Sequence, residues 1–105
     1  MSEIIRESHR VTVIPGRDIV ASMAGDLRTE LNEEIADHIK ELTLDLNGVE
    51  MVDSVGIGVI IATHNTLDQQ GAKLKVINIA EEIFGLFTTM RLDRHFVIEK
   101  FDDGL

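Results

Sequence analysis

Two short runs of the chain alternate apolar with polar residues, and a longer apolar segment separates them. Residues 42–46 read LTLDL and residues 73–76 read KLKV. A period of two is typical of a β-strand with one buried face. The segment 55–69 between them is mostly apolar and is followed by Gly71, a common C-terminal stop of a helix. Strand, helix and strand in this order predict a βαβ unit with parallel strands and a right-handed crossover.

Three further segments have the composition of strands. They cover residues 3–8, 11–14 and 96–99, and the turn signal Pro15-Gly16 closes the second of them. Because the strands alternate instead of being apolar throughout, helices are expected chiefly on one face of the sheet. A chain of 105 residues suits one core. We therefore predict a single α/β domain over residues 1–105, with parallel neighbouring strands and helices chiefly on one face of the sheet.

Two more helices are expected from apolar residues that recur at three- and four-residue spacing. The first is predicted from Ser22, as its N-cap, to about Glu41, with a buried stripe of Ala24, Leu27, Leu31, Ile35 and Ile39. Its acidic residues fall on other faces and are expected to be solvated: Asp26, Glu30, Glu33, Glu34 and Asp37. The other helix is expected after a capping box of Asn78 and Glu81, with a buried stripe of Ile83, Leu86, Phe87 and Met90.

Charge and composition argue against several classes of function. The net charge is −9, and no basic stripe interleaved with aromatic residues is present, so neither nucleic acid nor an anionic membrane is expected as a partner. The chain has no Cys, which removes thiolate nucleophiles and thiolate metal sites. Its first residues are too polar for a signal peptide, and no apolar run approaches the roughly 18 residues of a membrane span. A cytoplasmic protein is expected.

Residues that carry chemistry gather where the helix after residue 52 should begin. The sequence there is Asp53-Ser54-Val55-Gly56-Ile57-Gly58. A helix N-terminus has unpaired N–H groups and a partial positive charge, so it can hold a phosphate. Ser54 is either an N-cap, worth about 1 kcal/mol, or a site of phosphorylation. Each glycine costs a helix up to roughly 1 kcal/mol, so the two allow either close packing inside the domain or close approach by a partner.

The common catalytic and nucleotide signatures are absent from this stretch. A dinucleotide loop would need a third glycine at position 61, which is Ile61, and no Gly-Lys-Ser/Thr phosphate loop exists. Ser54 lacks the Gly-x-Ser-x-Gly elbow, and His64 lies ten residues on, near the middle of the predicted helix. The four His have no metal-ligand spacing. No metal, no cofactor and no enzymatic activity are therefore expected.

The segment 42–79 resembles the signature region of STAS domains, and in particular the single-domain anti-sigma factor antagonists of bacteria. The matching elements are Leu44-Asp45-Leu46, Asp53-Ser54, Gly56-Ile57-Gly58, Gly71 with the strand after it, and the ending from Arg91 to Phe96. The resemblance covers nearly the whole chain. It implies the STAS fold, a mixed, mostly parallel sheet of four to five strands with helices packed chiefly on one face.

The resemblance also implies a switch at Ser54. A serine kinase that doubles as an anti-sigma factor phosphorylates the corresponding serine, and a metal-dependent serine phosphatase reverses the modification. Only the unmodified antagonist binds the kinase and releases its target. The partner-binding surface is expected to comprise Asp18, Asp53, Val55, Gly56, Ile57 and Gly58.

Two positions depart from the family pattern. Many members have Ser or Thr after the phosphorylated serine, and Val55 here leaves Ser54 as the local acceptor. Many also carry Gly-Glu-Leu-Asp in the first loop, where this chain reads Gly16-Arg17-Asp18-Ile19, so Asp18 is expected to act from a shifted position. An alternative function is that of a STAS subunit in a transport or lipid-trafficking complex, where Ser54 is only a cap and is not phosphorylated.

Overall fold

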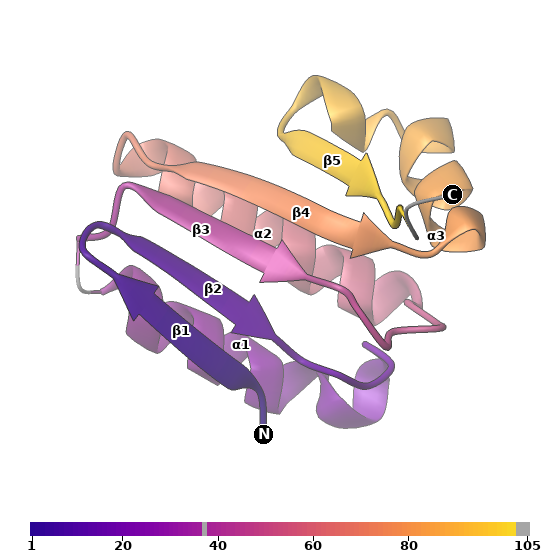
Figure 1. Ribbon diagram of the computed structural model, residues 1–105, viewed down its shortest axis with the longest axis horizontal. Helices are drawn as coiled ribbons and strands as arrows, with labels where there is room; N and C mark the ends of the chain where they lie inside the picture. Colours follow the sequence, from indigo (N-terminus) through magenta and orange to yellow (C-terminus); the bar gives the residue numbers. More distant parts are fainter. Residues whose placement is uncertain (37, 103–105) are drawn as a thin grey trace.

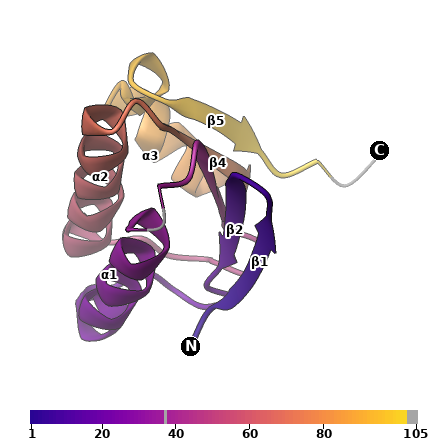
Figure 2. The same ribbon diagram turned by 90° about the vertical axis from the view of Figure 1, so that its left-hand side faces the viewer.

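The computed structural model describes residues 1–36 and 38–102. In this part of the chain the elements are β1 (Glu3–Glu7), β2 (Arg10–Ile14), α1 (Ala21–Ile35), β3 (Glu41–Asp45), α2 (Ser54–Gln69), β4 (Lys73–Ile79), α3 (Glu81–Thr89), the short 3-10 helix η1 (Leu92–Arg94) and β5 (Val97–Lys100). The strands lie side by side in one sheet (Figure 1), and the side view places the α-helices on one face of it (Figure 2).

The sheet has the order β1-β2-β3-β4-β5. β1 runs antiparallel to β2, whereas β2, β3, β4 and β5 are parallel neighbours. The parallel pairs place Leu42 opposite Leu74 and Leu44 opposite Val76, so the apolar positions of β3 and β4 share one face. The predicted α/β fold, with a mixed, mostly parallel sheet and helices on one face, is confirmed.

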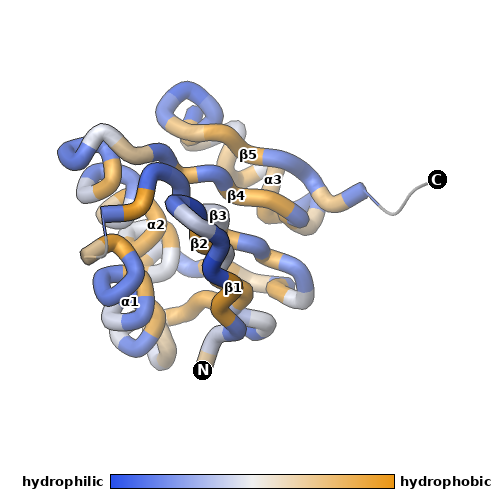
Figure 3. Tube along the Cα trace, turned by 60° about the vertical axis from the view of Figure 1, so that its left-hand side comes forward, coloured by the Kyte–Doolittle hydropathy of each residue, from blue (hydrophilic) through white to orange (hydrophobic). Residues whose placement is uncertain are grey.

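The core lies between the sheet and the helices. Its fully buried side chains include Val13, Leu42, Leu44 and Val76 from the sheet and Leu27, Leu31, Ile60, Leu67 and Phe87 from the helices. The intervening strand residues face away from the helices, and there Thr12, Thr43 and Lys75 lie in one cross-strand row. Figure 3 shows hydrophilic residues on the outer turns of α1, as expected for a helix that buries only one side.

α1 is shorter than predicted, and Ser22 is not its N-cap. The residue before the helix is Val20, and Ser22 lies exposed in the first turn. The helix ends at Ile35 instead of near Glu41. His38 adopts a left-handed backbone with φ of 58°, and the Lys40 N–H donates to the carbonyl of His9 at 2.7 Å. Pairing with β2 thus takes over from the helix before β3 begins.

The predicted solvation of the acidic residues on α1 is wrong for Glu34. Its side chain is buried and accepts two hydrogen bonds from the Arg6 guanidinium of β1, at 2.8 and 2.6 Å. Glu30 is half-buried and accepts two hydrogen bonds from Ser2, so it is not simply solvated either. Asp26 and Glu33 are exposed, as predicted. Asp37 lies outside the described residues.

The capping box predicted for α3 is wrong, and its buried stripe is narrower than expected. Asn78 belongs to β4, where its backbone is left-handed and its Nδ2 donates to Asp45 Oδ1 at 3.0 Å. The residue before α3 is Ala80, with no side-chain cap. Ile83 and Phe87 are buried, but Leu86 and Met90 are exposed because the helix packs through one narrow side.

Candidate functional site

The loop before α1 and the loop before α2 are joined by backbone pairing. The Ile19 N–H donates to the Met51 carbonyl at 2.9 Å, and the Asp53 N–H donates to the Ile19 carbonyl at 3.2 Å. Ile19 and Val52 form a parallel bridge, and both are buried. These bonds tie two loops that are more than thirty residues apart in the sequence, so the start of α2 is held on a fixed backbone support.

Asp53 caps two helices at once. Its Oδ1 accepts from the Gly56 N–H of α2 at 2.8 Å, and its Oδ2 accepts from the Ala21 N–H at the start of α1 at 2.9 Å. The bonds from Gly56 and Ala21 favour the ionised carboxylate and hold the pKa of Asp53 below its ordinary value. Asp53, and not Ser54, is therefore the N-cap of α2.

Ser54 is the first residue of α2 and is exposed. Among the residues that the structure describes, none hydrogen bonds to its hydroxyl. Because Asp53 already performs the capping, the serine is not needed to satisfy the helix end. The hydroxyl instead lies at the positive end of a helix, where added negative charge is stabilised.

The two glycines of this stretch have different surroundings. A Cβ on Gly56 would lie 2.2 Å from the Ile19 carbonyl oxygen, so only glycine fits there. A Cβ on Gly58 would meet nothing within 4 Å, and this glycine is exposed. Gly56 and Ile57 are buried, whereas Val55 is exposed. A partner approaching α2 therefore meets Val55 and Gly58 directly, with Gly56 and Ile57 beneath them; the partner-binding role of all four stays a prediction.

Asp18 lies in the same structural unit as the start of α2. Its Oδ1 accepts from the backbone N–H groups of Glu50 and Met51, at 2.9 and 3.0 Å. It thereby holds the turn that leads into Asp53 and Ser54, which is a positioning role. No local sequence pattern indicates this contact, because Asp18 and Glu50 are 32 positions apart.

Met51 is a surface residue that the sequence pattern does not reveal. Its side chain is 57% exposed, next to the buried Val52 and three positions before Ser54. Strand-like alternation would have placed Val49 and Met51 on the same side, yet Val49 is buried. The loop is irregular here because Asp18 and Ile19 bond its backbone, so period-two arguments do not apply.

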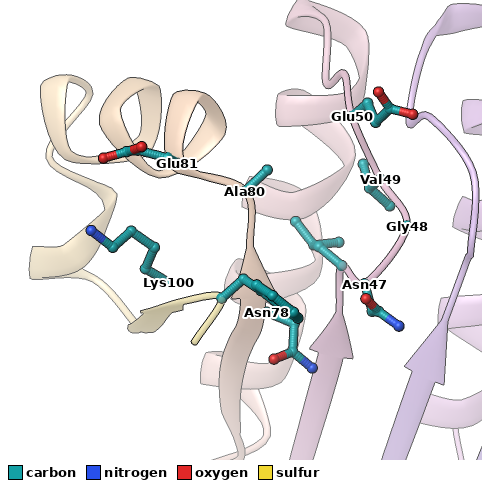
Figure 4. A pocket seen from close by; sticks show the side chains of 10 residues that line it. Asn47, Gly48, Val49, Glu50, Asn78, Ala80, Glu81 and Lys100 are labelled. Carbon is teal, nitrogen blue, oxygen red and sulfur yellow. The ribbon is translucent and has the colours of Figure 1, made fainter. Parts of the chain in front are cut away.

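A hollow of about 480 Å³ lies beyond the carboxyl ends of β3, β4 and β5. Figure 4 shows the side chains of Asn47, Asn78, Ala80 and Lys100 around it. Crevices of this kind are common ligand sites in parallel sheets. Its lining includes none of the residues predicted for the site at Ser54. Within the described residues, no group of three or more His, Asp or Glu is arranged to hold a metal ion, and no helix is long and apolar enough to cross a bilayer.

The amino-acid sequence is similar to that of a known protein family. The STAS domain family model matches residues 4–103. The anti-sigma-B factor antagonist of Bacillus subtilis (strain 168) is 31% identical over 77 residues, which are 67% of this chain and 71% of that protein. The chain belongs to the STAS domain family. Its sequence relates it to the anti-sigma factor antagonists within that family.

Solved structures show the same fold. A putative anti-sigma factor antagonist from Thermotoga maritima superposes with a TM-score of 0.88 at 19% identity, covering 94% of this chain and 86% of that one. The Bacillus cell fate determinant SpoIIAA in its phosphorylated form gives a TM-score of 0.75 at 11% identity, covering 93% and 90%. The identities are low, so these two likenesses establish architecture alone.

Proposed function

We propose that this chain is an anti-sigma factor antagonist that acts by phosphorylation-controlled partner switching in the cytoplasm. The unphosphorylated form binds a serine kinase that is also an anti-sigma factor, and the kinase then releases its target. Phosphorylation of Ser54 abolishes binding, and a metal-dependent serine phosphatase restores it. The chain itself acts as a binding protein and not as an enzyme.

The observation that carries this proposal is the state of the Ser54 hydroxyl. It is exposed at the first residue of α2 and bonds to no described residue, so a kinase reaches it without unfolding the chain. The similarity to the Bacillus subtilis antagonist supports the same role. The phosphorylated form of SpoIIAA, which has the same architecture, is consistent with a fold that tolerates a phosphate.

The physical effect of the phosphate is local. It adds about −1.5 to −2 charges at pH 7 beside the carboxylate of Asp53. The N–H groups at the start of α2 stabilise that charge, so the fold is unchanged. A partner that binds over Val55 and Gly58 meets added bulk and repulsion between like charges, and the complex dissociates.

The proposal is tested by incubating the chain with ATP and the purified serine-kinase anti-sigma factor of the same organism. Mass spectrometry should locate one phosphate on Ser54, and Ser54→Ala should bind the kinase without being modified. Ser54→Asp should bind at least about tenfold more weakly while keeping the native circular dichroism spectrum. Modification at another residue, or equal binding of the phosphorylated and unmodified chains, would contradict the proposal.

A further inference from the structure

The exposed face of α2 is free of charge over most of its length. From Ser54 to Leu67 the helix contains no Asp, Glu, Lys or Arg, although such residues make up 28% of the chain. Exposed or half-buried residues recur on one face at three- and four-residue spacing: Ser54, Val55, Gly58, Ile61, Ala62 and Asn65. The half-buried His64 and Thr66 flank this face. Depletion of charge on an exposed apolar face is typical of the core of a protein–protein interface.

This face continues into a hollow between α2 and η1. The hollow measures about 250 Å³, and Ile61, His64, Met90, Leu92 and His95 line it together with Asn65 and Phe96. Met90 is 43% exposed. The lining contains no carboxylate, although 19 residues of the chain are acidic. It therefore suits a large apolar side chain better than a basic one.

The two ends of the face differ in charge. Near Ser54 lie two carboxylates: that of Asp53, which caps α2, and that of Asp18, which holds the turn before it. At the far end Arg91 stands between the lining residues Met90 and Leu92.

In the part of the chain that the structure describes, no ion pair includes Arg91. Asp93 and Arg94, which follow on η1, offset each other in charge. A complementary partner is therefore basic where it faces Ser54, apolar where it enters the hollow and acidic where it faces Arg91.

We propose that the kinase partner binds along the whole uncharged face of α2 and inserts an apolar side chain into the hollow beside Met90. Its basic groups face Asp53, and an acidic group faces Arg91. This inference rests on the proposed function and extends the contact surface about 16 Å beyond Ser54, the rise of the eleven residues to Asn65. A charge added at Ser54 then acts at one end of the interface, and the contacts at the hollow add affinity at the other end.

The test compares two substitutions of equally exposed apolar residues. Met90→Glu places a charge at the hollow, and Ile5→Glu places the same charge on β1, where the side chain is 42% exposed. With the purified serine-kinase anti-sigma factor, calorimetry should show affinity about tenfold lower for Met90→Glu and changed less than about twofold for Ile5→Glu. Arg91→Asn removes the positive charge that faces the acidic group of the partner, so association should be slower and should depend less on salt. Asparagine tolerates the left-handed backbone at this position.

Hydrogen exchange on the wild-type complex provides a measurement that needs no variant. Amides of residues 61–66 and 90–96 should gain protection together with those of residues 50–58. Protection confined to residues 50–58, or wild-type affinity of Met90→Glu, overturns this inference and leaves the switch at Ser54 intact. A wild-type chain that binds no kinase overturns both. A dimer of the chain alone that Met90→Glu dissociates shows that a second copy covers the hollow, which also overturns it.

Discussion

At the residue scale, Asp53 does more than cap the helix it precedes. One carboxylate oxygen bonds the start of α2 and the other bonds the start of α1, 32 positions away. A single side chain therefore sets the relative position of two helix N-termini beside Ser54. A change in its charge or geometry destabilises the starts of both helices, because each has a backbone N–H that has no intrahelical partner and bonds to Asp53 instead.

The pKa of Asp53 leads to a prediction about pH. The hydrogen bonds lower this pKa in the folded chain relative to the unfolded chain, so ionised Asp53 contributes stability above its ordinary pKa. That contribution is lost as the pH falls through the lowered value. Asp53→Ala should therefore be less stable than wild type at about pH 6, and the difference should shrink toward about pH 3.

Urea unfolding at both pH values measures the effect. Asp26→Ala, which removes an exposed carboxylate from α1, is the matched control and should change stability little at either pH. A deficit of Asp53→Ala that stays constant over this range would mean that ionisation of the side chain plays no part.

Gly56 and Gly58 should respond to the same substitution with opposite signs. Gly56→Ala forces a methyl group against the Ile19 carbonyl oxygen and should cost at least about 2 kcal/mol of unfolding free energy. Gly58→Ala enters open space and should add up to about 1 kcal/mol, because alanine favours the helix. Thermal unfolding measures both. Gly25→Ala on α1 also enters open space, so it is the control and should behave like Gly58→Ala. A Gly58→Ala variant less stable than wild type would contradict the conclusion that Gly58 faces open space.

At the element scale, side chains of α1 hold β1 to the rest of the domain. Glu34 accepts two bonds from Arg6, and Glu30 accepts one bond from the Ser2 N–H and another from its hydroxyl. β1 is an edge strand with only β2 beside it. These contacts add to the backbone ladder with β2 and to the packing of Ile4 against the core.

The bond between Arg6 and Glu34 can be tested by a double-mutant cycle. Glu34 is only 4% exposed, so Arg6→Met leaves a buried carboxylate without this partner. The free energy of unfolding should fall by about 1–2 kcal/mol. The loss is smaller than for a fully buried pair because the Arg6 side chain is largely exposed to solvent. The double variant Arg6→Met, Glu34→Met should be more stable than the sum of the single changes predicts. Strict additivity in urea unfolding would show that the two side chains do not interact energetically.

At the scale of the whole molecule, the buried core and the exposed start of α2 occupy different parts of the layered fold. The sheet and the inner sides of the helices form the core (Figure 2), and the start of α2 lies at one end of this framework. The net charge of −9 attracts basic partners over some distance, but screening at physiological salt limits the influence of one phosphate to about 8 Å. The proposed phosphate on Ser54 would therefore act through the groups next to it and not through the total charge.

The alternation of strands and helices and the position of Ser54 at the start of a helix were predictable, and several helix ends were not. The runs 42–46 and 73–76 have a local period that demands strands with one buried face. The end of α1 was missed because Ile39 continues the helical spacing, although its burial comes from the turn into β3. Asn78 has the spacing of a helix cap in the sequence, but its side chain donates to Asp45, 33 positions away on the neighbouring strand.

The fold class, the place of Ser54 at a helix start and the family can be inferred from residues that are neighbours in the chain, because periodicity and a short motif are local. The capping of two helices by Asp53, the turn held by Asp18, and the inward packing of Gly56 beside an outward-facing Gly58 depend on the folded structure. These contacts join residues far apart along the chain, and a local pattern cannot specify which distant backbone group a carboxylate or a glycine will meet.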